Sequence, residues 1–220
     1  MVKIDIYLYL EVIILKILNK NQIKEASEIL LNNGILAFPT ETVYGLAVIA
    51  PSLENYNHLV DVKKRPPEKP FTLMASNLKQ VEKYIEINEI ARKIIAKFMP
   101  GPITLILKAK NNIPYTIDHG TGFVGIRIPD DKFVLKLIDM VNDALFVPSC
   151  NKSGEKPCMN TEDVIHDFEG EIDAVIDGTC GNGVPSTIIK IDGNNITLIR
   201  QGELKLTDIE EALNENCIRL

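Results

Sequence analysis

The 220-residue sequence contains no tryptophan and few of the residues that build metal sites or disulfide frameworks. Its three histidines are His58, His119 and His166, and its four cysteines are Cys150, Cys158, Cys180 and Cys217. The histidines are widely scattered and no two cysteines form a C-x-x-C pair, so neither a zinc site nor a disulfide framework is indicated. No protein metal cage is therefore expected, and the cysteine pattern favours a reducing, cytoplasmic compartment.

The sequence also lacks an uninterrupted apolar run of membrane-spanning length. Its N-terminal stretch "MVKIDIYLYLEVIILKIL" is apolar, but four charged residues break it too often for a signal peptide or a spanning helix. We interpret residues 1–19 as an N-terminal extension that includes a first strand near Val12 to Ile17. No membrane partner is expected.

An excess of positive charge is missing as well. The 24 Lys and Arg residues are outnumbered by 30 Asp and Glu residues, which gives a formal charge of −6. This balance argues against a protein whose whole surface neutralises phosphate, although a local basic cleft is compatible with it. With 45% hydrophobic and 25% charged residues the composition is that of an ordinary globular protein, and the length favours a single domain over residues 1–220.

Familiar catalytic and phosphate-binding motifs are absent or out of context. No Gly-Lys pair occurs, so there is no Walker A motif. "GTGFVG" at 120–125 fits G-x-G-x-x-G, but a strand is expected after it where the dinucleotide motif needs a helix, so we interpret it as a turn. "SCNK" at 149–152 fits S-x-x-K without the partner motifs of penicillin-recognising enzymes.

What the sequence does contain is a mixed α/β pattern. Apolar residues recur at helical spacing in 22–33, 53–63 and 87–98, and helices are also predicted at 131–141 and 161–168. Short apolar runs predict strands at 35–38, 103–109, 125–129, 144–148, 173–177 and 186–191, and another strand ends at Arg200.

Three of the predicted strands end at a proline and are followed by polar residues, which predicts a site where their loops meet at one edge of a sheet. The prolines are Pro39, Pro129 and Pro148, and the polar residues after the first of them are Thr40, Glu41, Thr42 and Tyr44. We expect these four residues to lie on the floor of the site, with Gly45 letting the chain turn away. A single proline at a strand end has the ordinary explanation that it stops pairing.

Cations and hydroxyl groups accompany these strands. "DVKKRPPEKP" clusters Lys63, Lys64, Arg65 and Lys69 on a stiff backbone suited to polyphosphate, although composition alone is equally compatible with a solvated helix end. Arg127 lies inside an apolar strand, where a guanidinium either grips a ligand carboxylate or forms a structural salt bridge.

The loop "VPSCNKSGEKP" adds Ser149, Asn151 and Ser153, and "PSTIIKI" adds Ser186 and Thr187 at the start of a strand. Hydroxyl groups, amides and flexible backbone at this density suit phosphate oxygens.

Taken in chain order, "GILAFPTETVYGLA", "KKRPPEKPF", "PGPITLIL", "VGIRIP", "VPSCNKSG", "VIDG", "PSTIIKI" and "LIRQGEL" resemble the YrdC-like family of threonylcarbamoyl-AMP synthases, over a core of about 20–205. The resemblance implies a YrdC-like α/β domain, with a twisted mixed β-sheet flanked by helices and an open, cationic substrate cleft. It also implies a nucleotidyltransferase that joins L-threonine, bicarbonate and ATP into threonylcarbamoyl-AMP and pyrophosphate, for the threonylcarbamoyl modification of an adenosine in tRNA.

Carried over by position, the resemblance assigns roles to individual residues. Threonine would be held by Thr42, Arg127 and Ser186. The nucleotide would be held by Arg65, Lys69, Ser149, Asn151 and Arg200, with Lys63 and Arg65 as catalytic residues. Mg²⁺ is expected to arrive on ATP, and a threonylcarbamoyl transferase complex is expected as the downstream partner.

The sequence departs from the family pattern at several positions. Cys150 and Ala47 replace residues that are usually alanine and glycine, Gln201 replaces a usual proline, and Met74 stands where some longer members place a threonine-contacting histidine. The chain resembles the short form of the family, without the additional C-terminal domain of longer members.

Two alternatives remain. One is a module that binds tRNA or double-stranded RNA without catalysis, against which the net charge and the lack of a basic-aromatic stripe count. The other is a carbamoyl-transferring paralogue of hydrogenase maturation, whose members normally carry further domains.

Overall fold

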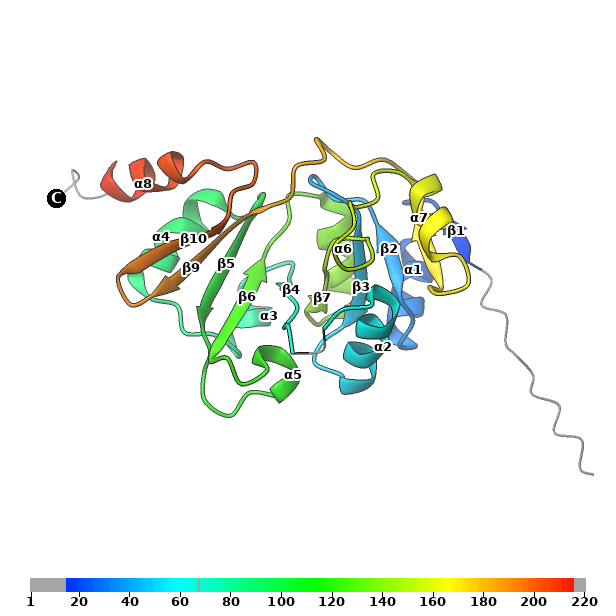
Figure 1. The fold of residues 1–220 in the computed structure, drawn as a ribbon, viewed down its shortest axis with the longest axis horizontal. Coiled ribbons are helices and arrows are strands. Elements are labelled where there is room, and N and C mark those ends of the chain that lie inside the picture. Colours follow the sequence, from blue (N-terminus) through cyan, green and yellow to red (C-terminus); the bar gives the residue numbers. More distant parts are fainter. Residues whose placement is uncertain (1–14, 67, 216–220) are drawn as a thin grey trace, which may run out of the picture.

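The computed structural model describes residues 15–66 and 68–215, and within them it contains one ten-stranded mixed sheet flanked by helices (Figure 1). The strands are β1 (Lys16–Leu18), β2 (Leu36–Phe38), β3 (Gly45–Ile49), β4 (Leu73–Met74), β5 (Ile103–Lys108), β6 (Phe123–Arg127), β7 (Leu145–Phe146), β8 (Ala174–Ile176), β9 (Thr187–Asp192) and β10 (Asn195–Arg200). They lie in the order β1-β8-β2-β3-β7-β4-β6-β5-β9-β10.

The helices are α1 (Ile23–Leu31), α2 (Leu53–Lys63), α3 (Lys79–Glu82), α4 (Glu89–Phe98), α5 (Tyr115–Asp118), α6 (Lys132–Val141), α7 (Thr161–Phe168) and α8 (Leu206–Glu215). Four of them begin at a side-chain N-cap, namely Ser52, Asn88, Asp131 and Asn160. Each cap oxygen accepts a hydrogen bond from a backbone N–H of the first turn, which fixes where the helix starts.

The predicted helices and strands are present, with shifts at their ends. The helix predicted at 53–63 has those bounds, whereas the strand predicted at 125–129 begins two residues earlier, at Phe123. The predicted first strand begins at Lys16 instead of Val12, and its predicted residues 12–14 lie outside the described part of the chain.

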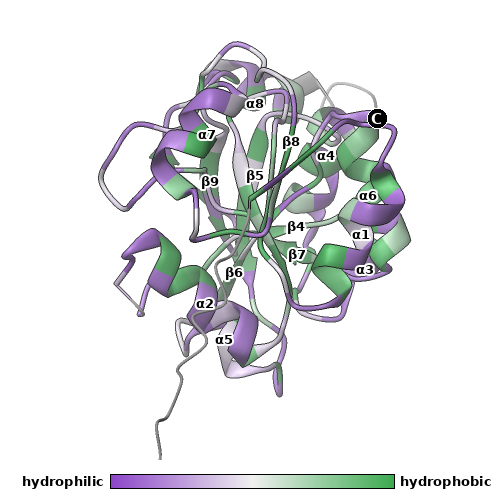
Figure 2. Cartoon of the chain, turned by 90° about the vertical axis from the view of Figure 1, so that its right-hand side faces the viewer, coloured by the Kyte–Doolittle hydropathy of each residue, from purple (hydrophilic) through white to green (hydrophobic). Residues whose placement is uncertain are grey.

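One half of the sheet, β1-β8-β2-β3, is covered by helices on both faces. Alternate residues of a strand point to opposite faces, and Leu36 and Phe38 pack in one apolar cluster with α1 and α6. Ile35 and Ala37 belong to the other cluster, together with buried residues of α2 and α7. Figure 2 shows the apolar residues gathered on the strands and on the sheet-facing sides of the helices.

The other half, β6-β5-β9-β10, is covered differently. Ile103, Leu105 and Leu107 of β5 are buried in the same cluster as Ile94 of α4 and Ile209 of α8. The opposite face of β5 carries Thr104, which lines a cavity together with Ile188 of β9. This half of the sheet therefore has one face packed against helices and one face that contributes to the cavity.

Two strands of two residues each, β7 and β4, join the halves. The antiparallel pairs β2–β3, β3–β7 and β7–β4, followed by the parallel pair β4–β6, make β2 and β6 run in opposite directions. The loops after β2 and β6 nevertheless meet, because Arg127 at the end of β6 contacts Glu41 and Thr42. The prediction that these loops meet is confirmed, although the two strands that they follow are antiparallel.

Two predictions about the segment after β2 are also wrong. Gly45 does not turn the chain away but begins β3, where a Cβ atom would lie 2.5 Å from Cγ1 of Val147. Tyr44 is fully buried in the core, and its hydroxyl donates to the carbonyl of Gly178 at 2.8 Å. Burial is the main cause that raises the pKa of Tyr44 to about 12, so this phenol is a neutral structural group.

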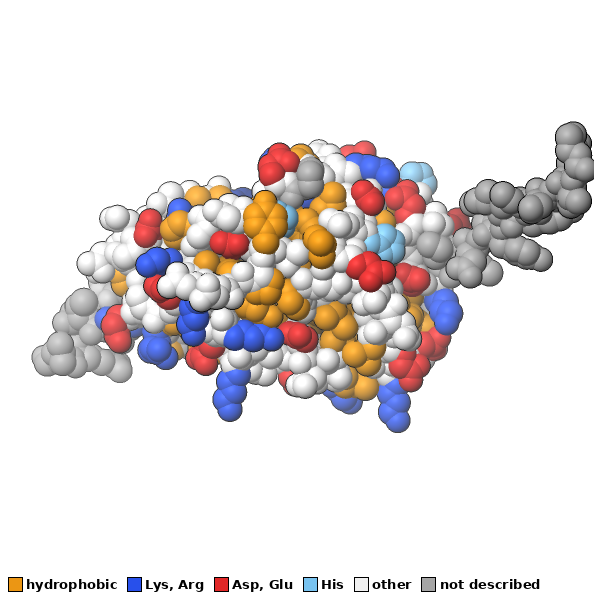
Figure 3. Space-filling view, turned by 90° about the horizontal axis from the view of Figure 1, so that it is seen from below, with side chains coloured by type: hydrophobic (Ala, Val, Ile, Leu, Met, Phe, Trp, Pro, Cys, Tyr) orange, Lys and Arg blue, Asp and Glu red, His pale blue; other side chains and the backbone are white. Residues whose placement is uncertain are grey.

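The surface at the α2 and α5 end shows apolar side chains between charged ones (Figure 3). Leu53 and Tyr115 belong to these helices and are 60% and 66% exposed. Single exposed apolar residues are normal on a protein surface. None of the helices in the described ranges combines the length and the apolar character needed to cross a membrane.

Candidate active site

A cavity of about 420 Å³ brings together most of the residues that the sequence predicted as a site. The predicted residues that line it are Arg65, Arg127, Ser149, Asn151, Ser186 and Arg200. Other lining residues include Met74, Thr104 and Glu155. The cavity thus combines three guanidinium groups with one carboxylate and several hydroxyl groups, and its residues come from both halves of the sheet.

Arg127 is the central side chain on one side of the cavity. Its side chain is 8% exposed, and its Nη2 donates to Oε1 of Glu41 at 2.7 Å and to Oγ1 of Thr42 at 2.9 Å. Thr42 is buried and does not line the cavity, so its contact with threonine stays a prediction; its hydroxyl also lies 2.9 Å from Oγ1 of Thr40. The sequence left open whether Arg127 forms a structural salt bridge or faces a ligand. In the structure it forms a salt bridge with Glu41 and also lines the cavity.

Ser186 and Arg200 form a second contact at the cavity wall. Nη2 of Arg200 donates to the backbone oxygen of Ser186 at 2.8 Å and to its hydroxyl at 3.2 Å. The Ser186 hydroxyl also lies 2.9 Å from Oγ1 of Thr104. Burial, with a smaller contribution from the positive charge of Arg127, lowers the pKa of Arg200. The positive charges of the two guanidinium groups therefore repel each other across the cavity.

Lys63, the last residue of α2, holds the loop that carries Ser149. Its ammonium is buried and donates to the backbone oxygens of Ser149 and Asn151, the second at 2.7 Å, and to Oδ1 of Asn151 at 3.4 Å. Burial lowers the pKa of Lys63 to about 8. Lys63 is not among the residues that line the cavity, so the structure gives it a loop-holding position, and its direct catalytic role stays a prediction.

The same loop is closed by its own side chains. Nδ2 of Asn151 donates to the backbone oxygen of Glu155 at 2.9 Å, and the Ser149 hydroxyl donates to Oδ1 of Asn151. Cys150 between them is fully buried, and burial raises the pKa of its thiol well above the ordinary value. A protonated, enclosed thiol is inert, so Cys150 is a packing residue of this loop.

Arg65 is fixed by the segment that follows it. Its Nε donates to the backbone oxygen of Lys69 and its Nη2 to that of Pro70, both at 3.1 Å, and its guanidinium lies 4.9 Å from the Phe71 ring centre. These contacts fix the Arg65 side chain, and the expected stiffness of the backbone in this segment stays a prediction. Lys69 is exposed and does not line the cavity, so its nucleotide contact stays a prediction.

Sequence reasoning missed Thr104 and left Glu41 without a role. A signal for Thr104 was available, because it is the one hydroxyl in the apolar run "ITLIL". Glu41 stands between two threonines, and its partner could not be read from the pattern.

The segment Thr40–Thr42 is itself held by the loop between β8 and β9. Gly181 N donates to the oxygen of Thr40 and Gly183 N to that of Thr42, both at 3.1 Å. The two backbones approach so closely that a Cβ atom on Gly181 would lie 1.9 Å from the oxygen of Glu41. Glycine is therefore required at position 181 by the contact with Glu41.

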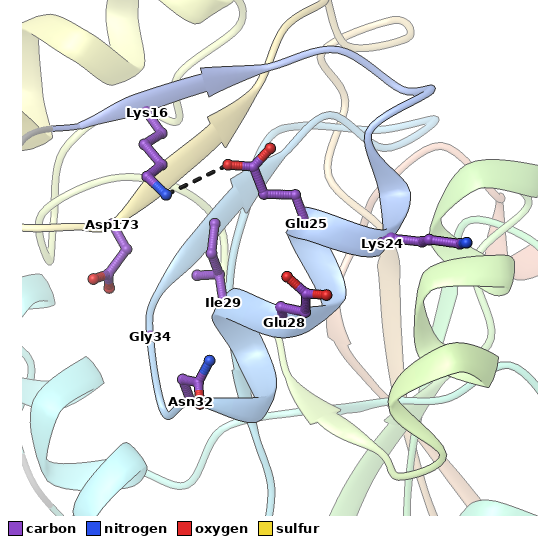
Figure 4. Close-up of a pocket in the computed structure, with 8 residues that line it drawn as sticks. All are labelled: Lys16, Lys24, Glu25, Glu28, Ile29, Asn32, Gly34 and Asp173. Carbon is purple, nitrogen blue, oxygen red and sulfur yellow. Dashed lines mark hydrogen bonds and ion pairs between the residues drawn. The ribbon is translucent and has the colours of Figure 1, made fainter.

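The described residues contain no group of three or more His, Cys, Asp or Glu side chains that could hold a metal ion. A second cavity, of about 520 Å³, lies beside α1 (Figure 4). There Lys16 pairs with Glu25 at 3.4 Å, and Asp173 accepts from the backbone N–H of Ile35. None of the predicted site residues lines this cavity, and we do not assign it to the site.

Known proteins resemble this chain in sequence. The family model Sua5_yciO_yrdC, described as "Telomere recombination", matches residues 28–202. A protein of Methanocaldococcus jannaschii named "Putative threonylcarbamoyl-AMP synthase" is 34% identical over 194 residues, which cover 86% of this chain and 91% of that protein. The "Threonylcarbamoyl-AMP synthase" of Bacillus subtilis is 33% identical, over 89% of this chain and 57% of that protein.

A solved structure has the same fold. The crystal structure of Pyrococcus abyssi Sua5 complexed with L-threonine matches with a TM-score of 0.85 and 32% identity, over 92% of this chain and 61% of that chain. This chain therefore spans less than two thirds of the Pyrococcus and Bacillus proteins and most of the Methanocaldococcus protein.

Proposed function

This chain belongs to the Sua5, YciO and YrdC family, and from that premise we propose that it is an L-threonylcarbamoyladenylate synthase. The enzyme would condense L-threonine, bicarbonate and ATP into threonylcarbamoyl-AMP and pyrophosphate. The observation that carries the proposal is that one cavity joins Arg127 and Ser186, assigned to threonine, with Arg65, Ser149 and Arg200, assigned to the nucleotide.

The proposed chemistry requires positioning and neutralisation of charge. Bicarbonate and the amine of threonine lose water to form a carbamate, and a carbamate oxygen then attacks the α-phosphorus of ATP while the bond to pyrophosphate breaks. Arg127 would bind the threonine carboxylate, and Arg65 and Arg200 would bind the phosphate oxygens, where negative charge develops. No side-chain nucleophile takes part, in agreement with the buried, protonated state of Cys150.

Mg²⁺ would enter as part of the ATP substrate. The cavity lining offers three guanidinium groups and the single carboxylate of Glu155, which suits an anion that brings its own counter-ion. A dedicated Mg²⁺ site would need several oxygen ligands from carboxylates. The residues present would therefore fit ATP that carries its own Mg²⁺, and the arginines would neutralise phosphate charge.

The proposal predicts that pyrophosphate release needs all three substrates together. Purified full-length protein with ATP, threonine and bicarbonate should release pyrophosphate, and omission of threonine should lower the rate by at least about 100-fold. The measurement is coupled pyrophosphate detection, with threonylcarbamoyl-AMP identified by mass. An undiminished rate without threonine would contradict the proposal.

The partners that we propose follow from the product. A mixed anhydride such as threonylcarbamoyl-AMP is consumed by group transfer, so a threonylcarbamoyl transferase complex acting on tRNA would take it up. Weak tRNA binding at the cavity arginines would be compatible with that transfer. A salt titration tests the rival RNA-binding module, because a steep salt dependence of RNA affinity without ATP-dependent turnover would favour that module.

Arg200 is predicted to act mainly on the nucleotide. Arg200→Ala should raise the KM for ATP by about tenfold and the KM for threonine by about threefold. The threefold effect on threonine is indirect: Arg200 donates to the backbone oxygen and the hydroxyl of Ser186, the residue assigned to threonine, and the variant loses both hydrogen bonds. Steady-state kinetics with each substrate varied in turn measures both values, and a larger change for threonine would reverse the assignment.

A further inference from the structure

Glu41 holds the guanidinium of Arg127 at the edge of the cavity. Its Oε1 accepts from Nη2 of Arg127 at 2.7 Å and from the backbone N–H of Asp130 at 3.1 Å. The side chains of Glu41 and Arg127 are 19% and 8% exposed. A carboxylate this enclosed is screened little by solvent, so the contact fixes the segment after β2 to the end of β6.

The hydrogen bonds of Arg127 leave one end of the guanidinium available. Nη2 carries two hydrogens, and both are used, one by Glu41 and one by Thr42. No partner for Nη1 is found among the described residues. Arg127 lines the cavity and Glu41 does not, so a ligand carboxylate can approach Arg127 without displacing Glu41.

The pair is also one hydrogen bond short of a two-point contact. Oε2 of Glu41 and Nε of Arg127 are both buried, and neither has a partner within the described part of the chain. An arginine fork facing a carboxylate would satisfy both atoms, and buried polar atoms are seldom left unpaired. The guanidinium is thus not oriented for a two-point contact with Glu41, and it faces the cavity instead.

The negative charge of Glu41 also balances the positive charge of Arg127. Arg127 shares the cavity with Arg65 and Arg200, and its charge contributes to the lowered pKa of Arg200. Without a carboxylate beside it, the Arg127 guanidinium would be repelled by Arg200 and attracted by any polyphosphate in the cavity. Glu41 supplies the local negative charge that opposes both effects.

Resting on the function proposed above, we propose that Glu41 is a positioning residue for threonine binding. It fixes the Arg127 guanidinium so that the unpaired end meets the threonine carboxylate, and it keeps Arg127 away from the phosphates of ATP. Glu41 acts through Arg127 and does not touch threonine.

The test begins with Glu41→Gln, which keeps an oxygen acceptor for Arg127 and Asp130 but removes the charge. We expect the KM and the calorimetric Kd for threonine to rise about tenfold, with the KM for ATP and kcat changed less than about threefold. Glu86→Gln, which removes an exposed ion pair with Lys108 outside the cavity, is the matched control and should change neither. Melting temperatures equal to that of the wild type in both variants would exclude a folding defect as the cause.

A double-mutant cycle separates action through Arg127 from direct action. If Glu41 acts through Arg127, the double variant Glu41→Gln/Arg127→Ala should bind threonine no more weakly than Arg127→Ala alone. A further tenfold loss in the double variant would overturn the proposal, and so would an unchanged or lowered threonine KM in Glu41→Gln. A lowered KM would show that Glu41 competes with the substrate carboxylate. A wild-type protein that neither binds threonine nor turns it over would overturn the proposed function, and the role of Glu41 with it.

Discussion

Replacement of Arg127 by alanine is expected to raise the KM for threonine by about 100-fold and the KM for ATP by less than about threefold. The guanidinium is enclosed, so its contact with a carboxylate is charge-assisted and little screened by solvent. Truncation would also leave the Glu41 carboxylate buried beside the empty position, where it repels the incoming carboxylate of threonine. Both effects act on the amino-acid substrate.

The measurement is pyrophosphate release with threonine varied at saturating ATP and bicarbonate, and then with ATP varied at saturating threonine. Arg92→Ala removes an exposed arginine of α4 and serves as the control, because it should leave both constants unchanged. An equal rise in both KM values for Arg127→Ala would show that the division of the cavity into a threonine side and a nucleotide side is wrong.

Replacement of Lys63 by methionine is expected to lower kcat/KM for ATP by about 100-fold and to lower the melting temperature. Methionine has a similar length but cannot donate a hydrogen bond. The backbone oxygens of Ser149 and Asn151 would lose their shared donor, and the loop that carries the Ser149 hydroxyl would lose its anchor. Activity is measured by pyrophosphate release and stability by thermal unfolding.

The pH dependence of ATP binding gives a second measurement of Lys63. Its pKa of about 8 lies below the ordinary value of 10.5, so the amine loses its charge as the pH rises through about 8. A neutral amine has two hydrogens for the three oxygen atoms that Lys63 now contacts. ATP affinity of the wild type should therefore fall between pH 7 and about pH 9, whereas that of Lys63→Met should be weak and constant. A wild-type affinity that is constant over this range would show that the charge of Lys63 does not contribute to ATP binding.

Arg127 shows how far the sequence alone could lead. A guanidinium inside an apolar strand has few explanations, because burying a charge is costly unless it is paired or binds a ligand. That argument predicted the residue and its two possible partners. It could not identify Glu41, since the contact spans from the segment after β2 to the end of β6 and depends on the path of the chain between them.

The direction of β6 relative to β2 was not predicted, because it depends on the short strands that join the two halves of the sheet. A strand was predicted around β7, at 144–148, but β4 has two residues, too few for an alternating pattern to be visible. Without β4 the direction of β6 relative to β2 cannot be derived from the sequence. Lys63 illustrates the same limit, because the composition of its cationic segment does not show whether an ammonium points to solvent, substrate or backbone.

The close approach at Gly181 makes the threonine side adjustable from outside the cavity. In a library of variants, a methyl group at position 181 would displace the Glu41 backbone, whose oxygen lies 1.9 Å from where a Cβ atom would stand. The displacement would reach the guanidinium through Glu41 and Thr42 without altering any charged or hydroxyl group. Because glycine is required at position 181, an engineer who adapts the cavity to a different amino acid would substitute other residues of the loop between β8 and β9, which also holds Thr40 and Thr42.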